Sequence, residues 1–192
     1  MVDVWRMSMV TGKADSLAKE DLRLSESGIM WIFLAIACFI ADQLTKLWVS
    51  ASFEYREVLE VLPVFNLTLA HNYGAAFSML SEAGGWQRWM FSGLAIIASV
   101  IILGWLRRTP KSLRVFCISL TLILGGALGN VFDRLVHGYV IDFLDFHWGN
   151  AHFPAFNIAD TAITVGAILM LWYSFFIEPK LEAAQSEEGS KE

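Results

Sequence analysis

Apolar and polar positions divide the chain into four long hydrophobic stretches joined by polar segments. Each stretch approaches or exceeds the length of about 20 helical residues that crosses a hydrocarbon layer of about 30 Å. The stretches cover residues 28–50, 89–106, 115–132 and 156–177. This pattern predicts a membrane all-α fold with four transmembrane helices.

The connection between the first two stretches, residues 51–85, is too long for a tight turn. Apolar and polar residues alternate within it from Phe65 to Leu69. A period of two is typical of a strand with one buried face, so this connection predicts a small β element lying against the membrane.

Two tails flank the predicted membrane domain, residues 28–178. Residues 1–27 lack the apolar stretch and small-residue cleavage site of a removable signal peptide, so we expect a retained tail. Glu178 and Pro179 predict the end of the fourth helix, followed by a charged tail at residues 179–192.

The loop between the second and third stretches carries four basic and no acidic residues. They are Arg107, Arg108, Lys111 and Arg114. The positive-inside rule places this loop in the cytoplasm. Both tails are then cytoplasmic as well, and the two remaining connections face outward.

Composition supports a membrane protein and excludes one class of partner. The chain is 56% hydrophobic and 17% charged, compared with about 45–50% and about 25% in soluble domains. Its net charge of −5 comes largely from the C-terminal tail, so no basic surface remains for nucleic acid.

Acidic residues gather in the polar segment between the third and fourth stretches. Asp133, Asp142, Asp145 and Asp160 all lie within residues 125–161. Solvated helix ends could account for Asp145, but a carboxylate at the edge of a bilayer is costly and indicates function. The predicted topology also brings Asp42 and the amides of the outer segments to the same membrane level, which favours a site.

Asp142 and Asp160 form the pair that we favour for chemistry. Two close carboxylates do not both ionise easily, so one acts as an acid and the other as a base. Such a pair can activate water and protonate a leaving amine. The predicted orienting groups are Asn130, Asn157 and Arg134.

Four of the polar residues have structural alternatives. Asn130 could be a helix cap, and Asp133 could pair locally with a basic residue at the end of the third span. Asp42 and Lys46, four positions apart on one helix face, could form an interfacial ion pair with Lys46 extending towards water.

Other catalytic schemes lack their sequence patterns. The four histidines match no zinc spacing, and HExxH, GxSxG, phosphate-loop and dinucleotide motifs are absent. We therefore predict no metal and no cofactor.

Five motifs follow one another along the chain, and together they identify a family. They are DQLTK at 42–46, NYGAAF at 72–77, GNVFDR at 129–134, VIDF at 140–143 and FNIAD at 156–160. With these motifs, residues 30–177 resemble the lipoprotein signal peptidase (signal peptidase II) family of the bacterial inner membrane.

The resemblance implies an aspartyl protease that cuts prolipoproteins just before a cysteine carrying diacylglycerol. It implies a small extracytoplasmic cradle sheet from residues 51–85, an active site near the outer membrane face, contact with membrane lipid, and inhibition by the cyclic peptide globomycin. By motif, the catalytic residues are Asp142 and Asp160; the substrate-binding or orienting residues are Asn72, Gly74, Asn130, Arg134, Asn157 and Ala159; the supporting residues are Asp42, Lys46 and Asp133.

Two other functions remain as alternatives. A small proton-coupled transporter also uses intramembrane carboxylates, but it requires acids at several depths, whereas these gather at one face. A noncatalytic protein that binds lipoproteins would carry the same residues without turnover.

Overall fold

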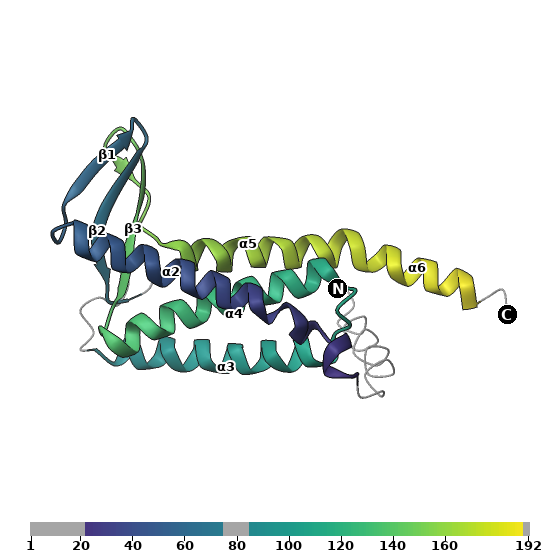
Figure 1. Ribbon diagram of the computed structural model, residues 1–192. Coiled ribbons are helices and arrows are strands. Elements are labelled where there is room, and N and C mark those ends of the chain that lie inside the picture. Colours follow the sequence, from purple (N-terminus) through teal and green to yellow (C-terminus); the bar gives the residue numbers. More distant parts are fainter. Residues whose placement is uncertain (1–21, 75–84, 190–192) are drawn as a thin grey trace, which may run out of the picture.

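The computed structural model describes residues 22–74 and 85–189, and in this part of the chain four long helices carry a small antiparallel sheet at one end (Figure 1). The helices of the bundle are α2 (Ile32–Ser52), α3 (Trp86–Arg108), α4 (Arg114–Val136) and α5 (Ile158–Trp172). Two short 3-10 turns, η1 (Leu24–Glu26) and η2 (Gly28–Trp31), precede α2. The predicted fold class, a membrane all-α fold with a small β element, is confirmed.

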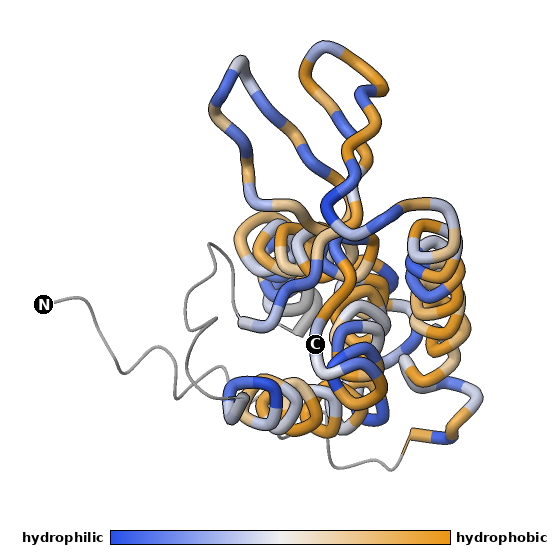
Figure 2. The backbone as a smooth tube through the Cα atoms, turned by 90° about the vertical axis from the view of Figure 1, so that its left-hand side faces the viewer, coloured by the Kyte–Doolittle hydropathy of each residue, from blue (hydrophilic) through white to orange (hydrophobic). Residues whose placement is uncertain are grey.

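The outward faces of these helices are apolar. The segments long and apolar enough to cross a membrane are Gly28–Ser52, Trp86–Arg108, Arg114–Val136 and Ile158–Ala184. Leu44, Ile97 and Ile168 are examples of the large hydrophobic side chains exposed around the bundle. Figure 2, seen from the sheet end, shows helices dominated by hydrophobic residues and strands that rise to one side. Such a surface suits a hydrocarbon environment.

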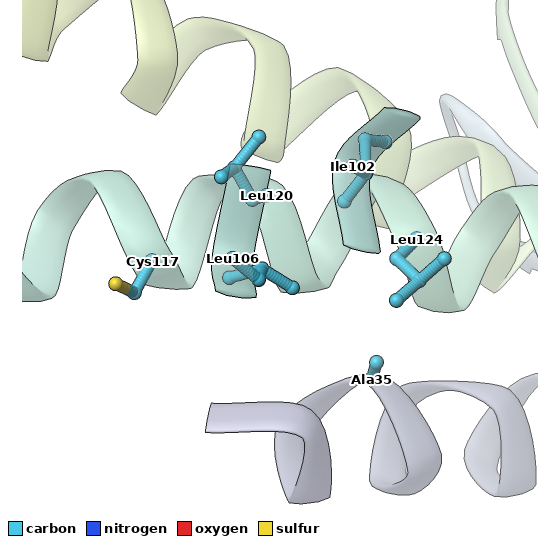
Figure 3. Packing of buried hydrophobic residues seen from close by; sticks show 6 residues of the cluster. All are labelled: Ala35, Ile102, Leu106, Cys117, Leu120 and Leu124. Atoms are coloured by element: carbon cyan, nitrogen blue, oxygen red, sulfur yellow. The ribbon is translucent and has the colours of Figure 1, made fainter. Parts of the chain in front are cut away.

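Helix α4 packs against α2, α3 and α5 and forms the centre of the bundle. Buried side chains meet around its first half, where Ala35, Ile102, Leu106, Cys117, Leu120 and Leu124 form one cluster (Figure 3). Towards its other end, Gly126 lies against the Ala159 carbonyl and Gly129 against the Asp42 carboxylate, where a Cβ would clash. Glycine thus lets α4 approach the two helices that carry polar site residues.

The helix of the fourth span does not stop at Glu178 and Pro179, so the prediction of a helix end there is wrong. The helix passes through one π-helical turn, η4 (Tyr173–Ile177), into α6 (Glu178–Gly189). Pro179 has no N–H to donate to the preceding turn, so it interrupts the helical hydrogen bonds at this point without ending the helix. The π turn lies immediately before Glu178 and Pro179 and changes the hydrogen-bond spacing of the helix there.

At the end of the bundle away from the sheet, the first described residues dock onto the basic α3–α4 loop. Arg107 donates through Nη1 to the Leu22 carbonyl at 2.6 Å, and Lys111 donates through Nζ to the Ser25 carbonyl at 2.8 Å. The N-terminal segment and the basic loop therefore lie on the same side, as the predicted topology requires.

The sheet has the order β1-β2-β3-β4 and is antiparallel throughout. Its strands are β1 (Val58–Leu62), β2 (Phe65–Asn72), β3 (Val140–Trp148) and β4 (Ala151–His152). The alternation from Phe65 to Leu69 correctly predicted a strand. Strands β3 and β4 were missed, although β3 carries Asp142.

Candidate active site

Asp142 on β3 and Asp160 in the first turn of α5 open onto the same pocket, which has a volume of about 950 Å³. The pocket runs from the sheet to Thr164 and Val165 on α5. Asn72, Gly74 and Arg134 also line it. Residues from β2, β3, α4 and α5 thus converge at one end of the bundle, as the topology predicted.

Asp142 is 2% exposed, and two amides hold its carboxylate. Asn72 donates through Nδ2 to Oδ2 at 3.0 Å, and Asn157 donates through Nδ2 to Oδ1 at 2.7 Å. Burial and then the charge of Asp160 raise the pKa of Asp142 to about 7, against the opposing effect of the two amides. Asp142 can therefore hold a proton near neutral pH.

Asp160 is fixed by a reciprocal capping box at the start of α5. Its backbone N–H donates to Asn157 Oδ1 at 2.9 Å, and its Oδ2 accepts from the Asn157 backbone N–H at 3.3 Å. Asn130 donates through Nδ2 to Asp160 Oδ1 at 2.7 Å. The positive end of the helix dipole favours a negative charge at this position.

The side chains of Asn157 and Asn130 connect the two carboxylates. Besides Asp142, Asn157 Nδ2 reaches the Asn130 Oδ1 at 3.2 Å, while Asn130 holds Asp160. Asn130 lies inside α4, so its interpretation as a helix cap is wrong. These amides fix both carboxylates while leaving oxygen lone pairs for a substrate.

A buried ionic cluster of Asp42, Lys46 and Asp133 lies directly behind the pair. Lys46 Nζ is 2.8 Å from Asp42 Oδ2, 2.8 Å from Asp133 Oδ2 and 3.1 Å from Asn130 Oδ1. Lys46 is 1% exposed, so its extension towards water is wrong. The local pairing of Asp133 is also wrong, because its cationic partner lies on α2.

The ionic cluster also holds the backbone beside each candidate catalytic residue. Asp42 Oδ1 accepts from the Ala159 N–H at 2.9 Å, immediately before Asp160. Asp133 Oδ2 accepts from the Ile141 N–H at 3.1 Å, immediately before Asp142. One buried cluster thereby sets the position of two chain segments that meet only in the fold.

Gln43 completes the ionic cluster, and the sequence analysis did not single it out. Its Nε2 donates to Asp133 Oδ1 at 3.0 Å and to Asp42 Oδ2 at 3.1 Å. Its place beside Asp42 in the first motif was the available signal. A side-chain amide satisfies lone pairs that a single ammonium leaves over.

Arg134 and Gly74 occupy the pocket wall. Arg134 donates through Nη1 to the Asn130 carbonyl at 3.3 Å, and its guanidinium carbon lies 5.3 Å from the centre of the Phe91 ring. The Gly74 N–H donates to Asn72 Oδ1 at 3.1 Å, which directs the Asn72 NH₂ group towards Asp142. The rest of that motif, residues 75–77, lies outside the described residues.

His71, next to Asn72, lies within an aromatic stack. Its ring centre is 4.6 Å from that of Tyr55 and 3.9 Å from that of Tyr139. Burial, and then neighbouring His137, lower the pKa of His71, so the imidazole is neutral at neutral pH. The stack anchors the end of β2 from which Asn72 reaches the site.

Asp145 and His152 are two further pocket residues to which the sequence analysis assigned no role in the site. Asp145 is 7% exposed and lies on β3, so a solvated helix end does not describe it. Within residues 22–74 and 85–189, no group of three or more His, Cys, Asp or Glu side chains is arranged to hold a metal ion.

A four-helix membrane fold with two amide-held aspartates in one pocket fits the class of intramembrane aspartic peptidases. Comparisons with known proteins assign the family. The model of the family signal peptidase (SPase) II matches residues 34–176. The chain therefore belongs to the signal peptidase II family and is a protease of the aspartic type. This match confirms the resemblance predicted from the five motifs.

Individual relatives agree with the family. The lipoprotein signal peptidase of Shewanella sp. (strain MR-4) is 52% identical over 167 residues, covering 87% of this chain and 98% of the relative. That of Shewanella loihica is 54% identical over 164 residues, covering 85% and 96%. A solved bacterial membrane enzyme has 31% identity and a TM-score of 0.66, covering 76% of this chain and 92% of the other.

Proposed function

We propose that the protein removes signal peptides from diacylglyceryl-modified prolipoproteins, cutting on the N-terminal side of the lipidated cysteine, with Asp142 and Asp160 as the catalytic pair. Its family and its lipoprotein signal peptidase relatives support the reaction. The observation that carries the residue assignment is the contact of Asn157 with both carboxylates.

The two aspartates divide acid and base roles. Asp142 holds the proton, and Asp160 is the base that takes a proton from the attacking water. As the water oxygen bonds to the scissile carbonyl carbon, Asp142 protonates the carbonyl oxygen. The C–N bond then breaks as Asp160 gives its proton to the leaving nitrogen and Asp142 regains a proton from a hydroxyl of the intermediate.

The surrounding side chains position this exchange. Asn72 and Asn157 hold Asp142, while Asn130 holds Asp160. The Arg134 guanidinium lines the pocket and offers its remaining donors to the substrate. Gly74 and Ala159 act through the backbone: one fixes Asn72, and the other ties α5 to the ionic cluster.

Substrate, lipid and inhibitor share the pocket in this proposal. The pocket reaches Thr164 and Val165 within the fourth span, where acyl chains of the lipidated cysteine remain in the bilayer. Globomycin competes for the same space. The membrane is the bacterial inner membrane, and the basic α3–α4 loop at the opposite end supports a site at its outer face.

The decisive experiment is a gel-shift assay with purified protein in detergent and a diacylglyceryl-modified prolipoprotein. Wild-type protein cleaves the substrate, and globomycin blocks cleavage. Asp142→Asn and Asp160→Asn each lower the rate by about 10²–10⁴-fold, because each removes a proton-transfer group. Glu60→Gln, an exposed carboxylate on β1, is the matched control and retains activity.

Near-normal cleavage by either folded aspartate variant would refute the catalytic pair. Binding of the prolipoprotein by folded wild-type protein without turnover would instead favour the noncatalytic alternative. Substrate-dependent proton flux in liposomes that persists when cleavage is blocked would favour the transporter.

A further inference from the structure

Asp145 and His152 form a second polar group in the pocket at the sheet end, and Asn66 contacts Asp145 from outside the pocket lining. His152 Nδ1 lies 2.9 Å from Asp145 Oδ1 and 3.0 Å from Oδ2. Asn66 donates through Nδ2 to Asp145 Oδ2 at 2.9 Å. Asp145 is thereby held from β2 and itself holds His152 on β4.

A β-bulge brings Asp145 to the same pocket as Asp142. The backbone N–H groups of Phe143 and Leu144 both donate to the Phe156 carbonyl, at 3.0 and 2.8 Å. Two residues of β3 therefore oppose one residue, which shifts the alternation of side chains along the strand. Asp142 and Asp145, three positions apart, both line the pocket.

The imidazole of His152 is oriented by this arrangement. A carboxylate accepts hydrogen bonds and donates none. His152 Nδ1, which lies against both Asp145 oxygens, therefore carries the hydrogen of this contact. The other ring nitrogen, Nε2, points to the far side of the ring, and no hydrogen bond within the described residues engages it. The His152 side chain is 51% exposed and lines the pocket, where a ligand can reach it.

The two ends of the pocket differ in their relation to the membrane. One end, at Thr164 and Val165, lies within the fourth span. The other end, at Asp145 and His152, lies in the sheet, which projects from the bundle (Figure 1). A substrate anchored by acyl chains at the first end must direct its polypeptide, which cannot enter lipid without hydrogen-bond partners, towards the second.

We propose that Asp145 and His152 form a subsite for the polypeptide that follows the lipidated cysteine. His152 binds the substrate backbone through Nε2, and Asp145 is a positioning residue that sets the ring. Phe153 and Pro154, the next residues along the chain, supply the apolar floor. This inference rests on the proposed peptidase function and adds where the retained part of the substrate binds.

The test uses two substrates with the same signal peptide and the same lipidated cysteine. One ends at the cysteine amide, and the other continues for about ten residues, about 33 Å in extended form. With full-length protein, His152→Leu raises the KM of the long substrate by about three- to tenfold, the value of one hydrogen bond, and leaves kcat within about twofold. The KM of the short substrate does not change.

Two further variants complete the design. His152→Gln restores most of the affinity for the long substrate, because its amide offers hydrogen-bonding groups near the same place. His147→Leu is the matched control. The His147 ring stacks on His152 with a centre distance of 5.0 Å but does not line the pocket, so both KM values stay unchanged.

Equal losses with both substrates in His152→Leu would overturn the subsite and leave a purely structural role. Unchanged KM for the long substrate would also overturn it. If wild-type protein cleaved neither substrate while a control peptidase cleaved both, the proposed function itself would fail, which is a different result from either of these.

Discussion

The ionic cluster of Asp42, Lys46 and Asp133 and the proposed catalytic pair of Asp142 and Asp160 each bring two aspartates together, yet they have different consequences. Both aspartates of the cluster are buried, whereas in the pair Asp142 is buried and Asp160 is partly exposed. In the cluster an ammonium lies 2.8 Å from each carboxylate. In the pair, neutral amides hold the carboxylates, and burial with mutual repulsion raises the pKa of Asp142 to about 7. Compensated carboxylates position the backbone, whereas uncompensated ones exchange protons.

The largest effect that distinguishes the two regions is expected on removal of the cation. Lys46→Met leaves two buried carboxylates facing each other and lowers the free energy of unfolding by about 3–5 kcal/mol. The drop in melting temperature in detergent measures this loss. The variant Asp142→Asn, by contrast, is expected to lose activity without such a drop, because the neutral amide resembles the protonated carboxyl group that the fold favours at this position.

The matched control for Lys46→Met is Lys180→Met, which changes an exposed lysine on α6. Its melting temperature stays at that of the wild type. If Lys46→Met melted at the same temperature as the wild-type protein, the ionic cluster would not support the fold.

A smaller effect is expected from Gln43→Leu, which removes an amide donor shared by Asp42 and Asp133. Loss of a partner to buried charged acceptors costs about 1–3 kcal/mol. The melting temperature falls accordingly, and kcat falls modestly because the Ala159 and Ile141 amides are less firmly held.

The control is Thr45→Val. Thr45 lies on the same helix, and its hydroxyl bonds to carbonyl groups within α2. A loss in Thr45→Val equal to that in Gln43→Leu would contradict a specific role for the amide.

Sequence reasoning predicted the four spans, because uninterrupted apolar stretches have few alternatives to membrane helices. It missed β3 because the Phe143–Leu144 bulge breaks the period of two by which a strand is recognised. It placed the helix end wrongly at Pro179 because a proline signal does not distinguish a helix stop from a proline within a continuous helix that contains a π turn.

The candidate site shows the same division. Motifs brought Asp142, Asp160 and the three asparagines into consideration, and their convergence followed from the predicted topology. The contacts of Lys46 with Asp133 and of Asp42 with the Ala159 N–H depend on how α2 packs against α4 and α5. Sequence spacing within one helix predicted only the Asp42–Lys46 pair.

The smallest effect sharpens the comparison by pH. Burial and Asp160 raise the pKa of Asp142 to about 7, so Asp142 is protonated below that pH and loses the required proton above it. We expect kcat/KM to fall about tenfold per pH unit above about 7. Folding stability also decreases as pH rises towards 7, since the ionised form is disfavoured in the fold, and then levels off. Reversible activity loss with an intact melting transition separates loss of the catalytic proton from unfolding.

Gln43→Leu is the control for this pH profile. Its kcat/KM falls above the same pH as in the wild type but from a lower maximum, because the ionic cluster does not supply the proton. A wild-type kcat/KM that stays constant up to pH 9 would contradict the role of Asp142 as the acid.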